Sequence, residues 1–198
     1  MNLNIVWVSI AILFDEGDRY IPEELLMYKI NYIVDKVKYL ISEYKTGDPF
    51  ELCDAMGIHI YYKDLGDRIK AFYFYQSRIK NIVINIRENE KIAKLLCSHE
   101  LGHCVLHGKP TDARAFCDMK IFDYASMAEC EANLFAAELM IDDSAIIEIL
   151  KNGGSVFDAA KLLEVPAGIV DFKLRILKNK GYDVKLPNLV NSEFLRNI

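Results

Sequence analysis

The chain lacks an excess of positive charge. Its 198 residues include 24 Lys and Arg against 29 Asp and Glu, which gives a net charge of −5 at pH 7. Proteins that hold nucleic acid by general electrostatic attraction carry the opposite balance. The composition argues against direct nucleic-acid binding, and we do not expect it.

Cysteine patterns typical of disulfide scaffolds are also missing. The five cysteines, an odd number, fall at positions 53, 97, 104, 117 and 130, and no two have C-x-x-C spacing. This spacing excludes a cysteine zinc knuckle and a disulfide framework, and it fits a reducing compartment. We therefore expect a cytoplasmic protein.

No apolar run is long enough to cross a bilayer, which needs about 20 residues. The longest, Leu3–Phe14, is interrupted by Asn4 and Ser9. No Lys or Arg precedes it, and the acidic stretch 15–18 follows where a signal peptide has small residues. We expect a buried strand or short helix here and no stable membrane insertion, with a membrane anchor as the alternative.

The chain has enough hydrophobic residues to form a core, because they make up 52% of the sequence. The length suits one domain, or one domain with an appendage. In chain order the pattern predicts a helix over 23–44, a short helix ending at Ala55, a strand over 58–62, a hairpin of strands 69–75 and 81–86 around the turn 76–78, and helices from residue 90 onward with breaks near 108–124, 152–154 and 181. A small antiparallel sheet between helices predicts an α+β fold.

The motif that carries chemistry is H-E-x-x-H, formed by His99, Glu100 and His103. Residues four apart on a helix lie about 40° apart around its axis, so both imidazoles project from one face. They can share a Zn²⁺ ion, while Glu100 flanks the metal and accepts a proton from its water.

The alternative to a metal site is a chance occurrence of this short motif, in which the polar residues of the helix face solvent. Here the flanking residues from Ile92 to Leu106 are almost all apolar, which predicts a buried helix. Buried histidines and a buried glutamate need partners, and a metal with its water supplies them.

The other two histidines give weaker signals. His107 lies eight residues after His99, near the expected helix end at Gly108. Interaction with the helix dipole is the simpler interpretation, and metal ligation is the alternative. His59 is isolated on a strand, and its position indicates no role.

The third ligand should be a carboxylate on the helix that follows Ser126. Glu129 lies about 160° around that helix from Glu131, on a face shared with Asn133. Glu129 can then reach the metal, and Asn133 can hydrogen-bond a ligating histidine. The alternative is a capping box in which Ser126 and Glu129 only stabilise the helix start.

With these residues in place, the chain resembles the ImmA/IrrE family of zinc metallo-endopeptidases. The family strings H-E-L-G-H and E-x-x-A-N-x-F-A-x-x-L-M correspond to residues 99–103 and 129–140, and the strand 82–85 ends in Asn, as is usual there. The resemblance covers roughly residues 23–180. One departure is Ile141, because a proline commonly follows the methionine.

The resemblance implies a zincin-like (gluzincin-like) fold, with His99, His103 and Glu129 as the zinc ligands and Glu100 as the general base. It also implies a protein substrate, because family members typically cut, or act on, DNA-binding repressors encoded beside them in mobile elements or stress regulons. The chain would then act as an anti-repressor.

The C-terminal residues 156–177 predict two short helices resembling a helix-turn-helix hairpin. Residues 151–198 carry eight Lys and Arg against five Asp and Glu, an excess too small for a DNA footprint. We expect this hairpin to pack on the protease domain.

Together these observations predict an N-terminal segment of unknown role (1–22), a zincin-like metallopeptidase domain (23–150) and a C-terminal helical extension packed on it (151–198). The expected function is zinc-dependent cleavage of a cytoplasmic regulatory protein, with a helix-turn-helix repressor as the expected target, by Glu-assisted attack of zinc-bound water. An edge strand of the hairpin would bind an extended substrate. The alternatives are a regulator that binds a repressor without cutting it and a DNA-binding module.

Overall fold

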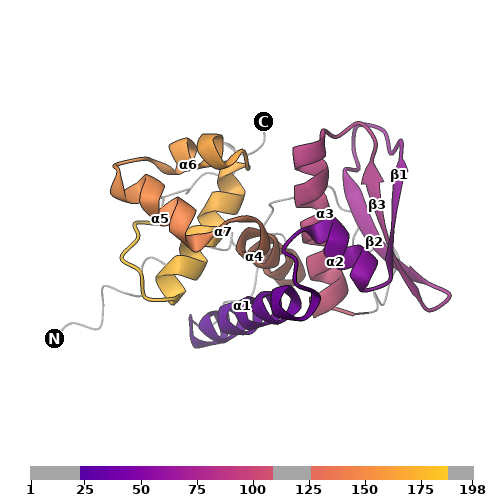
Figure 1. Ribbon diagram of the computed structural model, residues 1–198, viewed down its shortest axis with the longest axis horizontal. Coiled ribbons are helices and arrows are strands. Elements are labelled where there is room, and N and C mark those ends of the chain that lie inside the picture. Colours follow the sequence, from indigo (N-terminus) through magenta and orange to yellow (C-terminus); the bar gives the residue numbers. More distant parts are fainter. Residues whose placement is uncertain (1–22, 109–125, 187–198) are drawn as a thin grey trace.

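The computed structural model describes residues 23–108 and 126–186, and within them the α+β class is confirmed. The elements in chain order are α1 (Glu23–Tyr44), α2 (Pro49–Ala55), β1 (Ile58–Lys63), β2 (Ala71–Gln76), β3 (Ile79–Asn85), α3 (Glu90–Leu106), α4 (Met127–Met140), α5 (Asp143–Lys151), α6 (Val156–Leu163) and α7 (Ala167–Asn179). Figure 1 shows the sheet at one end of the molecule and α5–α7 at the other, with α3 and α4 between them.

The three strands form one sheet in the order β1-β3-β2, and the predicted hairpin is confirmed as β2 and β3. It turns through Ser77 and Arg78, both with positive φ, as a tight two-residue turn requires. The expectation of a wholly antiparallel sheet is wrong, because β1 pairs with β3 in parallel, with Ile60 opposite Ile82. Alternating apolar residues predict a strand but not its direction, and the link 64–70 carries the chain past β3 to the far edge.

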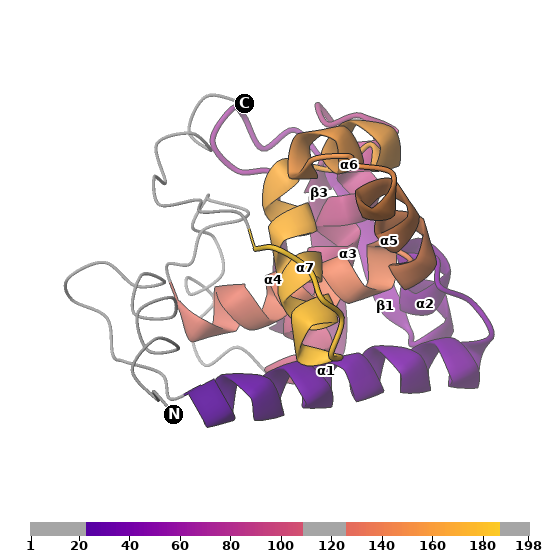
Figure 2. The same ribbon diagram turned by 90° about the vertical axis from the view of Figure 1, so that its left-hand side faces the viewer.

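One face of the sheet packs against helices. Tyr73, Ile82 and Ile84 are buried there, and α3 contacts both β2 and β3. Helix α4 packs along α3, α7 packs on α4, and α1 runs across both α4 and α7 (Figure 2). The prediction that the motif helix is buried is confirmed, because almost all its residues from Ala93 to Cys104 are inaccessible.

The predicted C-terminal hairpin is confirmed as α6 and α7, joined at Glu164, whose φ is +56°. Helix α7 is buried along nearly its whole length, so it belongs to the core rather than to an appended surface. Whether a domain boundary falls at residue 150 stays a prediction.

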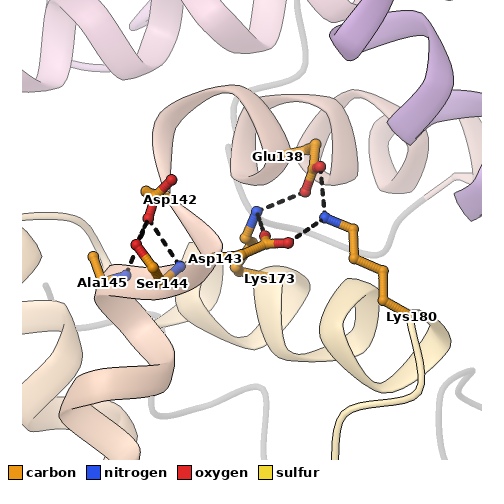
Figure 3. A network of polar contacts seen from close by, with 7 residues as sticks. All are labelled: Glu138, Asp142, Asp143, Ser144, Ala145, Lys173 and Lys180. Carbon is orange, nitrogen blue, oxygen red and sulfur yellow. Dashed lines mark hydrogen bonds and ion pairs between the residues drawn. The ribbon is translucent and has the colours of Figure 1, made fainter.

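A partly buried ionic network ties α7 to α4 and α5 (Figure 3). Lys173 Nζ lies 2.6 Å from Glu138 Oε2 and 2.5 Å from Asp143 Oδ1. Lys180 Nζ lies 2.7 Å from the other oxygen of each carboxylate. Two lysines therefore neutralise two carboxylates, and the charge of the nearly inaccessible Lys173 is fully paired.

The cysteines at 53, 97, 104 and 130 are buried free thiols. Cys117 and the apolar run Leu3–Phe14 lie outside the described residues. Among the helices that the structure describes, none combines the length and the apolar character needed to cross a membrane.

Candidate active site

Helix α3 presents the motif residues to the interior. It begins where the side chain of Asn89 accepts a hydrogen bond from the backbone N–H of Ile92. Two turns further on, His99 and His103 lie one above the other, and their Nε2 atoms are 3.1 Å apart. Both side chains are almost inaccessible to solvent.

Helix α4 supplies the third side chain. Glu129 Oε2 lies 3.2 Å from His99 Nε2, and Glu129 Oε1 lies 3.3 Å from His103 Nε2. The backbone N–H of Glu129 donates to Ser126 Oγ, so Ser126 caps the helix while the carboxylate of Glu129 is turned toward the histidines. The carboxylate of Glu131, two residues on, contacts His107 instead of His99 or His103.

The approach of α3 to α4 depends on Gly102. A Cβ at this position would lie 3.2 Å from Ala132 Cα and 3.2 Å from Phe135 Cβ, closer than packed carbon atoms normally come. The absence of a side chain lets the two helices meet where the histidines face Glu129.

These three side chains fit a tetrahedral metal. Their donor atoms lie within 4.8 Å of one another, in the cluster His99, His103 and Glu129. Zinc bonds of about 2.0–2.1 Å at tetrahedral angles put neighbouring donors about 3.3–3.4 Å apart. The observed separations of 3.1 to 3.3 Å match that spacing, so the residues present can hold a metal ion.

The electrostatics of the cluster favour a bound cation. Burial raises the pKa of Glu129, but its hydrogen bonds to His103 and His99 outweigh burial and hold the pKa at about 2. Burial lowers the pKa of His103 to about 4, which leaves its ring neutral, as a ligand must be. Burial acts in the same direction on His99, but there Glu129 and Glu100 outweigh it, and the pKa of His99 is raised. The carboxylates thus attract positive charge to this point.

Glu100 lies beside the cluster but outside it. Burial, opposed by His99 and reinforced by Glu129, raises the pKa of Glu100 to about 7, and the nearby backbone of Tyr73 lowers it only slightly. Its Oε2 is buried and has no hydrogen-bond partner among the described residues. An acid with a pKa near neutrality and a free oxygen suits proton transfer.

The ligand-type histidines also have partners on their far sides. His99 Nδ1 lies 2.9 Å from Oδ1 of the fully buried Asn133. His103 Nδ1 lies 3.1 Å from His107 Nδ1, and His107 Nε2 lies 2.9 Å from Glu131 Oε2. The sequence pattern did not assign His107 or Glu131 to this arrangement. The four-residue spacing of His103 and His107 was the available signal.

Two histidines one helical turn apart, a carboxylate from the next helix and a flanking glutamate define a metal-dependent peptidase of the zincin type. The comparisons with known proteins agree. A family model described as Peptidase M78, IrrE N-terminal-like domain, matches residues 53–175. The chain therefore belongs to the ImmA/IrrE family of metallopeptidases, and it is a metallo-endopeptidase.

Two relatives cover most of the chain. Uncharacterized immunity region protein 2 of Bacillus phage phi105 is 36% identical over 144 residues, which is 72% of this chain and 90% of the relative. Metallopeptidase ImmA of Bacillus subtilis strain 168 is 29% identical over 152 residues, which is 76% of this chain and 88% of the relative.

Proposed function

We propose that the protein is a zinc-dependent endopeptidase that cleaves a cytoplasmic helix-turn-helix repressor of a mobile element or stress regulon. In this proposal His99, His103 and Glu129 bind the zinc, Asn133 orients His99, and Glu100 is the general base. The observation that carries it is the spacing of the three donors beside a buried glutamate with one free oxygen.

Zinc, when bound, lowers the pKa of its water toward about 7 and polarises the scissile carbonyl. Glu100 accepts the proton of the attacking water and then delivers it to the leaving amine. Asn133 accepts the Nδ1–H of His99, which would leave the Nε2 lone pair of that ring available to a metal ion.

Strand β2 is the proposed binding edge for the substrate. It is an edge strand of the sheet, it contacts α3, and the backbone of its Tyr73 lies close enough to Glu100 to affect the pKa of that carboxyl. A substrate segment added to this edge in extended form would place its peptide groups beside the general base. Such a segment must be accessible, which restricts cleavage to exposed stretches of the target.

A regulatory target is supported by the relatives. The phage relative is named after an immunity region, and the other relative is a metallopeptidase named ImmA. The free thiols support a target in a reducing compartment. The alternative of a non-cleaving regulator gives no reason for the buried Glu100, and the alternative of DNA binding through α7 conflicts with the burial of that helix.

The test is incubation of the zinc-loaded protein with the purified helix-turn-helix repressor encoded beside its gene, followed by mass spectrometry of the products. We expect cleavage at one or a few sites, no cleavage by the Glu100→Gln variant, and little digestion of casein. Rapid, indiscriminate digestion of casein would contradict a specific regulator and indicate a housekeeping peptidase. An intact repressor would contradict the proposed substrate while leaving the peptidase assignment in place.

A further inference from the structure

We infer that His107 and Glu131 are positioning residues that fix the ring orientation and the tautomer of His103. The inference rests on the proposed zinc site. It adds a second set of hydrogen bonds that orients a ligand histidine, besides the contact of Asn133 with His99. Asn133 of α4 holds one ligand histidine, and His107 at the end of α3, backed by Glu131 of α4, holds the other.

The tautomers follow from the contacts. For His103 Nε2 to bind a metal its lone pair would have to be free, which would place the ring proton on Nδ1. His107 Nδ1, 3.1 Å away, accepts that proton in a hydrogen bond. The proton of His107 then sits on Nε2, which donates to Glu131 Oε2 at 2.9 Å. In the series His103–His107–Glu131 every donor faces an acceptor. Reversing either histidine tautomer would bring two lone pairs or two protons face to face.

The far end of the series is anchored to another helix. Glu131 also pairs with Lys29 of α1, so its carboxylate is held from two sides. The side chains of His107 and Glu131 are largely buried, with exposed fractions of 18% and 13%. Hydrogen bonds shielded to this degree compete less with water and orient their partners more firmly.

The position of His107 is itself fixed by the backbone. Its N–H donates to the carbonyl oxygen of His103, so it ends α3 in register with the ligand. The next residue, Gly108, has a positive φ, and its carbonyl accepts a hydrogen bond from the Tyr73 hydroxyl. Sheet and helix therefore meet at the residue beside His107.

The simpler interpretation of His107, a histidine at a helix end, predicts an effect on stability alone. A positioning role predicts an effect on metal affinity, because hydrogen-bond partners of metal ligands typically contribute about 10–100-fold. Two substitutions of His107 distinguish the role of its Nδ1 from that of its Nε2. Asparagine keeps an acceptor oxygen near the place of Nδ1, whereas glutamine places its amide near Nε2 and removes the acceptor that His107 Nδ1 offers to His103.

The experiment measures zinc affinity by competition with a chromophoric chelator, and the visible absorption of the Co²⁺-loaded protein, for wild type, His107→Asn and His107→Gln. His59→Gln, at an exposed histidine on β1, is the matched control. We expect His107→Gln to lose affinity by about 10–100-fold and to shift the Co²⁺ bands, His107→Asn to stay close to wild type, and the control to be unchanged.

Equal affinities in the three proteins, or equal losses in both His107 variants, would overturn the inference, because the acceptor at Nδ1 would then have no separate role. Failure of the wild type to bind zinc would instead refute the proposed metal site. Thermal unfolding of the metal-free proteins shows whether each variant folds, so an unfolded variant is not mistaken for a weak binder.

Discussion

Replacing Glu100 by glutamine should stabilise the metal-free protein at alkaline pH. In the folded chain the pKa of Glu100 is raised to about 7 from its ordinary value of 4.5, first by burial and then by Glu129. At about 1.4 kcal/mol for each pH unit between these values, ionisation of this carboxyl costs the fold about 3 kcal/mol. The amide of glutamine has nearly the same shape and carries no charge.

The sign of the pH dependence follows from the raised pKa. The folded chain keeps the proton on Glu100 where the unfolded chain loses it, so this carboxyl destabilises the fold progressively as pH rises from 4.5 to 7. The Glu100→Gln variant has no ionisable group at this position, so its stability does not fall in this way as pH rises. We expect the two proteins to be equally stable near pH 4.5, and the variant to be more stable by about 3 kcal/mol at pH 8.

Urea unfolding in the presence of a chelator, followed by circular dichroism from pH 4.5 to 8, measures this difference. Glu43→Gln is the matched control, because Glu43 is exposed near the end of α1 and its replacement should change little at any pH. Added zinc should reduce the difference at pH 8, because a cation beside Glu100 stabilises its charge. A variant that is no more stable than wild type at pH 8 without metal would refute the assignment of Glu100 as a buried acid whose ionisation destabilises the fold.

Three further outcomes follow from the packing around the site and from the ionic network of α7. Gly102→Ala should lower the free energy of unfolding by about 1 kcal/mol and weaken metal binding. Overpacking against Ala132 costs about 1–3 kcal/mol, and the gain in helix propensity returns only about 1 kcal/mol. Urea unfolding and zinc titration check this. Lys173→Met should cost about 3 kcal/mol, because it leaves Glu138 and Asp143 with one lysine between them, yet zinc affinity should be unchanged. Asn133→Ala should lower zinc affinity by about 10–100-fold in the same titration, and an unchanged affinity would remove it from the support of His99.

The sequence predicted the positions of the helices and strands, and which residues come together at the site, better than it predicted the strand directions in the sheet. Helical periodicity is a local property, so the spacing of His99 and His103 and the opposite phases of Glu129 and Glu131 follow from residue numbers alone. The pairing of β1 with β3 depends on how the link 64–70 crosses the sheet, which no local pattern records.

The role of α7 and the surroundings of His107 depend on contacts that are distant in the sequence. An amphipathic hairpin at 156–177 was predictable, but the burial of α7 on α4 and α1 was not, because the helix needs both partners to lose its exposed face. Likewise the contact of Glu131 with His107 joins α4 to the end of α3, which pack closely at Gly102. The roles of the site residues remain predictions.

Zinc content and repressor cleavage measured on one preparation of the Glu100→Gln variant test the central claim most directly. Because Glu100 acts on water and does not bind the metal, we predict one zinc per chain, as in the wild type, and a loss of cleavage of at least about 100-fold. Loss of zinc together with activity would make Glu100 a ligand, and undiminished cleavage with zinc retained would remove it from the chemistry; either result would contradict the mechanism.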